Sequence, residues 1–446
     1  MTTRREFIRK ATLGTAALGL GNLIMAQNNF ARISGANDRL NVAIVGLGGR
    51  SHALAESISM CRNIRLAYVC DVDQTCIEKF MSFIQKIIDY KPEIIKDFRK
   101  ILDNKNIDAV FIATPEHWHA PMAIMAMQAG KHVYVEKPCS HNPFENELLV
   151  TAQKKYNKVC QMGNQQRSSV TSALAVADIQ NGLIGNAYMG KAWYSNTRGP
   201  IGKGNEVPVP STLDWELWQG PAPREKYRDN IHPYNWHWFR AWGTGEIHNN
   251  GTHELDICRW ALGVGYPQRV VSTGGRLHFT GDDWEFFDTQ MASYEFTGGK
   301  TITWEGRSCN GLNHHGTGRG ATIHGTKGSI FLDRSKYILY DLSGNIVKTE
   351  LEDNQGSSGN TADLSGFDKL TTRHIGNFAD AIRLNAKLNA PIADAAISTQ
   401  LCHLGNIAQD LKDSLVIDTN SGKVLASDKA NAMWKREYAQ GWEPAL

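Results

Sequence analysis

The chain has 446 residues, more than one typical hydrophobic core holds, and this length predicts two domains. Its apolar content of 41% and charged content of 21% are typical of soluble globular proteins and exclude a disordered or membrane-embedded chain. The 48 basic and 45 acidic residues give a net charge of +3, which lacks the basic excess typical of nucleic-acid-binding domains, so we expect no nucleic-acid partner.

The first 39 residues predict an export signal followed by a linker. Arg4 and Arg5 precede an apolar run over residues 11–25 that consists largely of Ala, Gly and Leu. This arrangement resembles a twin-arginine signal, and its glycines weaken the alternative, an amphipathic helix. Because the run is too short and too rich in glycine for a stable membrane span, we expect a periplasmic or otherwise exported protein with no span after signal removal.

Residues 40–160 predict an α/β domain. Four short apolar runs separated by helical segments are expected to form buried strands: 41–45, 64–70, 109–113 and 132–135. Strands of this kind that alternate with helices form a parallel sheet, covered on both faces and wound right-handed. The N-terminal domain is therefore expected to have the Rossmann fold.

A glycine-rich turn follows the first expected strand and opens a helix. Its residues are predicted to contact a dinucleotide: Gly46, Leu47, Gly48, Gly49 and Arg50. Gly46 permits the tight turn, and Gly48 lets the backbone approach a pyrophosphate at the helix N-terminus. Asp71, at the end of the second strand, would bond a ribose 2′-hydroxyl and repel a 2′-phosphate, so NAD is favoured over NADP. The alternative is a purely structural turn.

The remaining residues, 161–446, predict an α+β domain with a large, mostly antiparallel open sheet. Strands are expected near 290–296, 301–304 and 329–332. Apolar residues recur with helical spacing over 375–382 and 395–411. We expect these C-terminal helices to pack back towards the Rossmann domain.

Three further segments carry a family resemblance: residues 113–119 (Ala-Thr-Pro-Glu-His-Trp-His), residues 129–138, which end in Glu136-Lys137-Pro138, and residues 249–256. With the glycine-rich turn, they resemble the Gfo/Idh/MocA oxidoreductases, which include inositol dehydrogenase and glucose–fructose oxidoreductase. The resemblance covers nearly the whole chain after residue 40. It implies NAD(P)-dependent oxidation of carbohydrate CH–OH groups, and a homo-oligomer that pairs through the open face of the second sheet.

The resemblance also assigns roles to residues. It implies further cofactor contacts for five of them: Thr114, Pro115, His119, Glu136 and Gln165. Lys137 matches the family lysine that lies between nicotinamide and substrate, so it is expected to contact both. An ammonium beside the reacting hydroxyl can stabilise alkoxide charge as hydride leaves the carbon. A surface lysine is the alternative, although ligands bind at the carboxyl ends of strands in such sheets.

The segment 249–256 resembles the acid/base region of the family. His253 matches the family histidine, whereas Asn249 replaces an aspartate and can only orient a partner or hydrogen-bond to it. Asp256 lies three residues after His253, so on a helix it would share a face with the imidazole and could orient it or bind substrate. A buried structural histidine is the alternative.

Three residues are candidates for substrate contact: Arg167, Trp236 and His237. The Trp-rich stretch 233–240 could provide aromatic platforms for a sugar ring, and core packing is the competing explanation. The adjacent pair His314-His315 invites a metal site, but neighbouring residues point in different directions, so we predict no metal.

Together these features predict an exported NAD(H)-dependent oxidoreductase that acts on a secondary hydroxyl of a sugar or glycoside. Because free NAD is scarce outside the cytoplasm, we expect the cofactor to be tightly held. One alternative resembles the NAD-dependent N-acetylgalactosaminidases, which are redox-neutral glycosidases that oxidise, eliminate, add water and reduce; the Glu-Lys-Pro signature at Lys137 counts against it. A second alternative is a non-catalytic protein that binds sugar or nucleotide.

Overall fold

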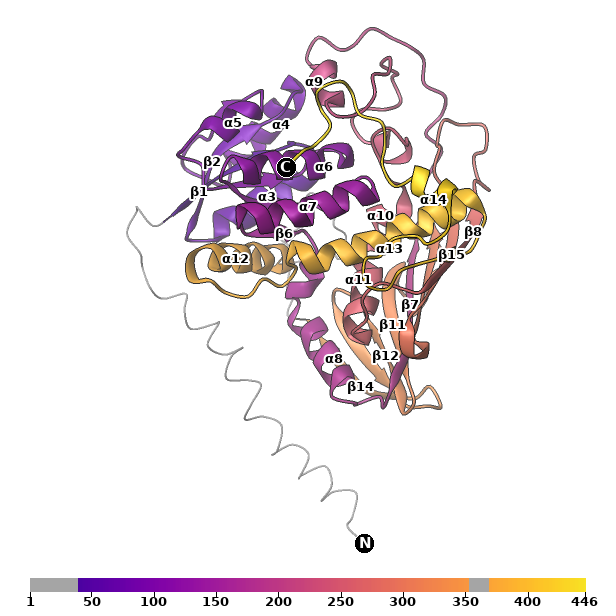
Figure 1. Cartoon of the computed structure of the whole chain (residues 1–446). Helices are drawn as coiled ribbons and strands as arrows, with labels where there is room; N and C mark the ends of the chain where they lie inside the picture. The colour runs from indigo at the N-terminus through magenta and orange to yellow at the C-terminus, as the bar shows by residue number, and fades with distance from the viewer. Residues whose placement is uncertain (1–38, 353–368) are drawn as a thin grey trace. The chain divides into compact units, whose positions relative to one another are not determined.

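The computed structural model describes residues 39–352 and 369–446, and the part from Leu40 onwards forms one unit with two sheets (Figure 1). The expected twin-arginine signal and its linker lie outside the described residues, apart from Arg39. None of the described helices is both long enough and apolar enough to span a membrane.

The first sheet is a six-stranded Rossmann sheet with the order β3-β2-β1-β4-β5-β6, and every pair in it is parallel. Its strands are β1 (Leu40–Val45), β2 (Ile64–Cys70), β3 (Glu93–Ile95), β4 (Ala109–Ile112), β5 (His132–Val135) and β6 (Cys160–Met162). The four expected strands are β1, β2, β4 and β5. Strands β3 and β6 have three residues each, too few to show a pattern, and β6 carries the sheet past the expected boundary at residue 160.

Helices cover both faces of this sheet. They are α3 (Gly49–Met60), α4 (Gln74–Ile84), α5 (Arg99–Asp103), α6 (His119–Gln128) and α7 (Pro143–Tyr156), with the short 3₁₀ helix η3 (Glu116–Trp118) before α6. Apolar side chains of α3 and α4 pack on one face, and those of α6 and α7 pack on the other. Because both faces are buried, the strands are continuous apolar runs, as the sequence shows.

The second sheet has nine strands in the order β14-β13-β12-β11-β7-β10-β9-β8-β15. Only β7 and β10 pair in parallel, so the sheet is mostly antiparallel, as predicted. Its strands are β7 (Ala187–Ser195), β8 (Arg269–Gly275), β9 (Thr289–Glu295), β10 (Thr301–Arg307), β11 (Arg319–Gly325), β12 (Gly328–Leu332), β13 (Lys336–Tyr340), β14 (Ile346–Leu351) and β15 (Leu415–Val416).

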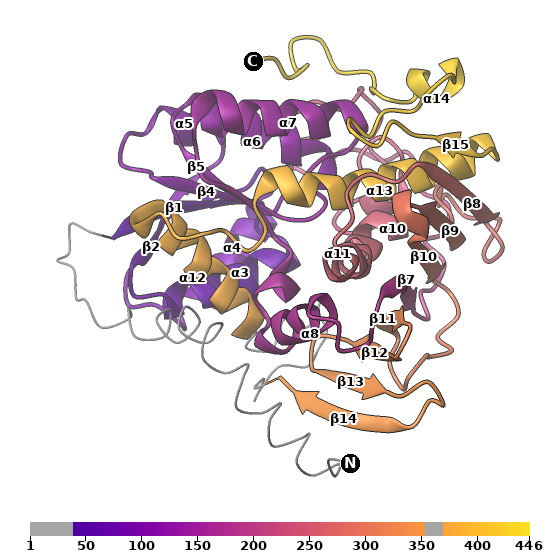
Figure 2. The ribbon, with the colours of Figure 1, turned by 60° about the horizontal axis from the view of Figure 1, so that its bottom comes forward.

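The helices of the second domain bury one face of this sheet and reach the first domain. They are α8 (Val170–Gln180), α9 (Trp215–Gln219), α10 (Glu246–Asn249), α11 (Gly251–Leu262), α12 (Lys369–Leu384), α13 (Ile392–Leu411) and α14 (Asp428–Ala432), with 3₁₀ helices η4 (Gln165–Ser168), η5 (Asn235–Trp238) and η6 (Thr297–Gly299). Side chains of α8, α11 and α13 pack on the sheet. Helix α12 packs on α3, and α13 runs from α7 to β8 (Figure 2).

Residues 196–245, which connect β7 to α10, form a segment with few regular elements, here called the bridging segment. It has its own aromatic core: Leu213, Trp215, Trp218, Ala222, Tyr227, Ile231, Phe239 and Trp242. Backbone hydrogen bonds join it to the end of the Rossmann strand β2, from Asp214 N to Val72 O (3.0 Å) and from Gln74 N to Thr212 O (2.9 Å). The bridging segment is thereby held against the strand ends of the first sheet.

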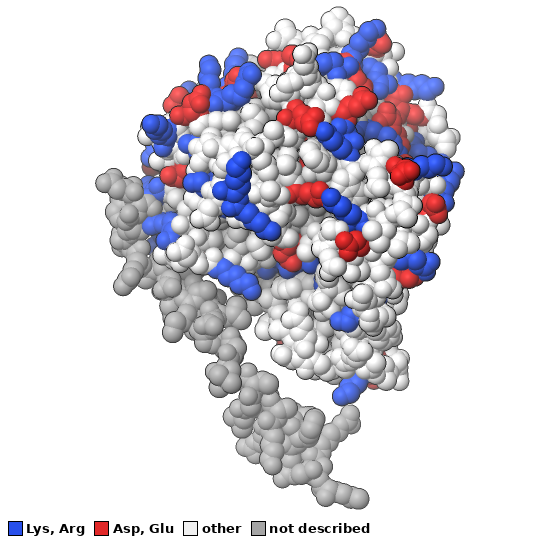
Figure 3. Space-filling model, in the orientation of Figure 1, with Lys and Arg blue, Asp and Glu red and all other residues white. Residues whose placement is uncertain are grey.

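On the face shown in Figure 3, basic and acidic side chains are interspersed. Few charges lie over α8 and β12, where the surface of this face is mostly neutral. This face therefore carries both signs of charge rather than a patch of one sign.

Candidate active site

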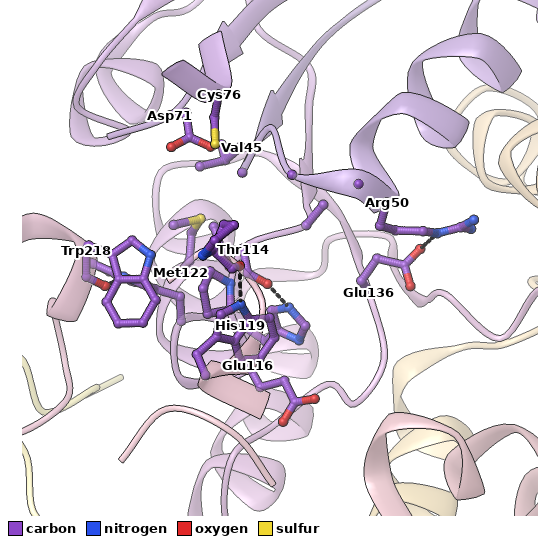
Figure 4. Close-up of a pocket in the computed structure, with 18 of the residues that line it drawn as sticks. Val45, Arg50, Asp71, Cys76, Thr114, Glu116, His119, Met122, Glu136 and Trp218 are labelled. Carbon is purple, nitrogen blue, oxygen red and sulfur yellow. Dashed lines mark hydrogen bonds and ion pairs between the residues drawn. The ribbon is translucent and has the colours of Figure 1, made fainter. Parts of the chain in front are cut away.

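A pocket of about 390 Å³ lies where the carboxyl ends of the Rossmann strands meet the bridging segment and helices α10 and α11 (Figure 4). It is lined by most of the residues that the sequence analysis predicts for the site: Gly46, Gly48, Gly49, Arg50, Asp71, Thr114, Pro115, His119, Glu136, Lys137, Gln165, Trp236, His237, Asn249 and His253. The fold therefore brings together segments that are more than 200 residues apart in the chain, as expected for a site at the edge of a parallel sheet.

The geometry of the glycine-rich turn fits the close approach of a dinucleotide. Gly46 has φ +86°, and a Cβ there would lie 2.6 Å from the backbone of Ala113 and Thr114. A Cβ at Gly48 would meet nothing within 4 Å, so the backbone is open towards the pocket at the start of α3. Both features match the roles of these glycines in a pyrophosphate site at a helix N-terminus.

The Asp71 carboxylate closes the turn and lines the pocket. Its Oδ2 accepts a hydrogen bond from Leu47 N (2.6 Å), and its Oδ1 accepts one from Asp73 N (2.9 Å). Leu47 thus contributes its backbone N–H, while its side chain is buried away from the pocket. Burial raises the pKa of Asp71, and the two N–H groups oppose that shift. The carboxylate is held in one orientation, as recognition of a ribose hydroxyl requires.

Arg50, at the start of α3, forms an ion pair with Glu136 that Gln165 extends. Arg50 Nε donates to Glu136 Oε1 at 2.8 Å, and Gln165 Nε2 donates to the same oxygen at 3.1 Å. Figure 4 shows the Arg50–Glu136 pair at the edge of the pocket. Gly163 makes room for this carboxylate, because a Cβ there would lie 2.8 Å from it. The pair therefore fixes Arg50 close to the strand ends.

His119 joins two strand ends. Its Nε2 lies 2.9 Å from Thr114 O, after β4, and its Nδ1 lies 2.6 Å from Pro138 O, after β5 (Figure 4). Burial lowers the pKa of His119, which favours the neutral ring. A neutral ring carries one N–H, so it can donate to only one of the two carbonyls at a time. His119 and Pro115 line the pocket beside the strand ends.

Lys137 and Asn249 meet in the pocket. Lys137 Nζ donates to Asn249 O at 2.5 Å and to Asn249 Oδ1 at 3.0 Å. Burial lowers the pKa of Lys137, and the carboxylates of Glu116 and Glu136 oppose this shift. The asparagine that replaces the family aspartate thus supplies two neutral acceptors to the ammonium, and it orients Lys137 without neutralising its charge.

His253, on α11, lines the pocket and is 3% exposed. Among residues 39–352 and 369–446, its Nδ1 has no hydrogen-bond partner. Burial holds the pKa of His253 well below its usual value, and the positive charges of Arg334, Arg319 and Lys137 lower it further. The imidazole is therefore neutral and a weak base, although it can still hydrogen-bond to a ligand.

Arg167 and Asp256 are not brought to the pocket. Arg167 donates twice to Asp256, from Nε to Oδ2 (2.7 Å) and from Nη2 to Oδ1 (2.8 Å), and Ser398 Oγ also donates to Oδ1 (2.6 Å). Both members of this pair are buried. Asp256 therefore orients Arg167 rather than the imidazole of His253, because a bidentate guanidinium satisfies a buried carboxylate better than a neutral ring does.

Trp236 and His237 lie on η5 and form a stacked pair with ring centroids 3.6 Å apart. Trp236 Nε1 donates to Pro233 O at 3.1 Å, and His237 Nδ1 lies 2.6 Å from Tyr234 O. Burial lowers the pKa of His237 to about 3, so the ring is neutral. The pair therefore presents a fixed aromatic surface to the pocket, of the kind that sugar rings stack on.

Several lining residues had no role in the sequence interpretation. Glu116 lies inside the nominated segment 113–119, and the bridging segment adds Trp218 and His232. Ligating atoms of Asp73, Cys76 and His232 lie within 4.8 Å of one another, a spacing that could hold a metal. His232 Nε2 is 3.0 Å from Asp73 Oδ2, so this pair already links the bridging segment to the Rossmann domain. No local pattern marks such contacts between distant segments.

Comparison with known proteins agrees with this geometry. The model of the oxidoreductase family with an NAD-binding Rossmann fold matches residues 40–164, and the GFO/IDH/MocA C-terminal domain matches residues 172–331. Glycosyl hydrolase family 109 protein 1 of Shewanella sp. (strain ANA-3) is 27% identical over 208 residues, which are 43% of this chain and 45% of that protein. An alpha-N-acetylgalactosaminidase of Shewanella oneidensis is 26% identical over the same shares. The chain thus matches less than half the length of these curated relatives.

Solved structures share the fold. Levoglucosan dehydrogenase in complex with NADH and levoglucosan has a TM-score of 0.64 at 20% identity, and the match covers 85% of this chain and 99% of that one. Aldose-aldose oxidoreductase from Caulobacter crescentus, complexed with glycerol, also has a TM-score of 0.64, at 17% identity, over 85% of this chain and 100% of that one.

Proposed function

Because the chain belongs to the Gfo/Idh/MocA oxidoreductase family and carries an NAD-binding Rossmann domain, we propose that it interconverts a secondary hydroxyl of a sugar or glycoside and the ketone. The proposal rests on the position of Lys137. This residue lines the pocket just after β5, and Asn249 orients its ammonium. There it would bond the substrate oxygen and stabilise the negative charge that develops on it.

The residues around the pocket fit NAD. The open backbone at Gly48 and the start of α3 would hold the pyrophosphate, and the Asp71 carboxylate would bond the adenosine ribose. When bound, NAD supplies the hydride acceptor or donor. The stacked rings of Trp236 and His237 would then position the sugar ring beside Lys137.

We further propose that NAD stays bound through the catalytic cycle and that the protein is exported. The bridging segment supports retention, because it lines the same pocket as the glycine-rich turn and is fastened to the Rossmann domain at Asp73 and His232. A second sugar or ketone would then return the cofactor to its starting state. Loss of all cofactor from natively exported protein on dialysis, with activity unchanged, would contradict this part of the proposal.

The first test is the absorbance of the purified protein before and after a panel of sugars and glucosides is added. We expect bound dinucleotide to be released on denaturation, and the band of reduced nicotinamide to grow with some of these compounds. A protein without bound dinucleotide that also binds no added NAD would overturn the proposal.

A second candidate is the redox-neutral glycosidase, which the names of the curated relatives favour. In that reaction, oxidation of the ring acidifies a neighbouring C–H, the leaving group is eliminated, water adds and the ketone is reduced again. Nitrophenyl glycosides separate the two: release of free sugar without added cofactor or second substrate indicates the glycosidase, whereas a stable reduced-nicotinamide band indicates the oxidoreductase.

A further inference from the structure

Glu116 is a buried acid inside the pocket. It is the first residue of η3, the short helix between β4 and α6, and is 2% exposed. Its Oε2 accepts a hydrogen bond from Thr244 Oγ1, at the end of the bridging segment. Figure 4 shows its side chain among those that line the pocket, which Lys137 and His253 also line. A carboxylate in this position is unusual unless a charged partner or a function compensates its burial.

The other groups near the ammonium are poorly suited to take a proton. Asn249 cannot accept one, and His253 is a weak base because burial and four positive charges lower its pKa. Glu136 is occupied by Arg50 and Gln165, which both donate to its Oε1. Glu116 has no arginine or lysine within ion-pair distance among the residues that the structure describes.

Glu116 and Lys137 interact without touching. The charge of each shifts the pKa of the other, yet Lys137 bonds Asn249 and Glu116 bonds Thr244. The ammonium and the carboxylate thus both border the same pocket and bond other residues rather than each other. A substrate hydroxyl placed there could accept a hydrogen bond from Lys137 and donate one to Glu116.

We propose that Glu116 is the proton acceptor of the reaction, an inference that rests on the proposed function. As the carbon gives up its hydride to the bound nicotinamide, the O–H bond breaks, its proton passes to the Glu116 carboxylate, and the C–O bond becomes a carbonyl. Lys137 keeps its proton and stabilises the oxygen. In the reverse direction, protonated Glu116 returns the proton to the alkoxide.

The electrostatics of the site match this role. Burial raises the pKa of Glu116 to about 7, and the negative charge of Glu246 adds to the shift. The Thr244 hydroxyl and the charge of Lys137 oppose it. An acid with a pKa near neutrality exchanges a proton efficiently at neutral pH, as general acid–base catalysis requires.

The direct test compares Glu116→Gln with the wild type in reduction of bound NAD by a sugar that the wild type accepts. Glutamine has the same shape and can keep a bond to Thr244, so the fold is expected to persist. We expect the rate of sugar oxidation to fall roughly 10²–10⁴-fold, the usual contribution of a general base. The rate of sugar oxidation by the wild type should rise with pH through about 7, and Glu116→Gln should lose this rise.

Glu225→Gln is the matched control. Glu225 lies outside the pocket and burial raises its pKa, so this variant should behave as wild type.

A readout without turnover completes the test. Infrared spectra of the NAD-loaded protein should contain a protonated-carboxyl band that titrates near neutral pH and is missing in Glu116→Gln. Thr244→Val removes a bond that lowers the pKa of Glu116, so it should move both the band and the rate profile to higher pH. If the wild type reduces its NAD with a sugar but Glu116→Gln keeps the rate and profile, this inference fails and the proposed function stands. If no sugar reduces the wild-type cofactor, the proposed function fails.

Discussion

The ammonium of Lys137 lies 2.5 Å from the backbone oxygen of Asn249. This hydrogen bond joins the carboxyl end of strand β5 in the Rossmann sheet to helix α10 of the second domain. The contact limits how a substrate oxygen can bind, because two of the three N–H groups of the ammonium donate to Asn249 and one is left for a ligand.

Removal of this charge tests Lys137 directly. In Lys137→Met, sugar-dependent reduction of the bound nicotinamide is expected to slow roughly 10²–10³-fold, the cost of losing one donor to a developing oxyanion. The NAD content of the purified protein should stay unchanged, because the turn and Asp71 are intact. Wild-type turnover in this variant would show that Lys137 has no catalytic role.

Asn249→Asp restores the acidic residue of the family motif. A carboxylate at the position of Oδ1, 3.0 Å from Nζ, should raise the pKa of Lys137, which burial now lowers. Since the protonated lysine is the active form, the alkaline limb of the kcat/KM profile should move to higher pH. Asn249→Ala is the control, because it keeps the backbone acceptor and adds no charge. An alkaline limb that stays in place would mean that it does not report on Lys137.

The contact between His232 and Asp73 should limit cofactor release. In His232→Phe, the 3.0 Å contact that fastens the bridging segment is lost, and NAD is expected to dissociate several-fold faster. Stopped-flow exchange of bound NAD for a fluorescent analogue measures this rate. Lys226→Ala removes an exposed ion pair with Glu206 in the same segment and should leave the rate unaltered. Equal rates of NAD dissociation in the wild type and both variants would show that other contacts retain the cofactor.

Asp256 is expected to act on stability rather than chemistry. Although burial would raise its pKa, the Arg167 guanidinium holds the pKa of Asp256 below its usual value. A carboxyl with a lowered pKa contributes stability above its unfolded pKa, and this contribution is lost as pH falls through the folded pKa.

Asp256→Ala removes the bidentate partner of Arg167 and leaves its guanidinium only the ion pair with Asp394 (3.0 Å). We therefore expect a loss of about 3 kcal/mol in the free energy of unfolding, the lower end of the cost of breaking a buried pair. Urea unfolding at neutral and acidic pH measures this loss, which should shrink towards acidic pH. The folded variant should still reduce its NAD with the sugar. An Asp256→Ala protein that is stable but inactive would instead show that Asp256 takes part in catalysis.

The sequence by itself determined the first domain and the composition of its cofactor turn. Strands β1, β2, β4 and β5 were predictable because a sheet buried on both faces requires continuous apolar runs, and Gly46 was predictable because its turn requires a positive φ. Strands β3 and β6 were not predicted, since three residues are too few to show a periodic pattern of apolar side chains.

Only the tertiary structure decided how the charges of the site are arranged. It gave Asp256 Arg167 as its partner in place of His253, and it placed His253 where four positive charges lower its pKa. It also placed Glu116 in the pocket with Lys137. Spacing along one helix predicts which side chains share a face, but a pKa depends on burial and on charges from distant segments, and these exist only once the domains and the bridging segment have packed together.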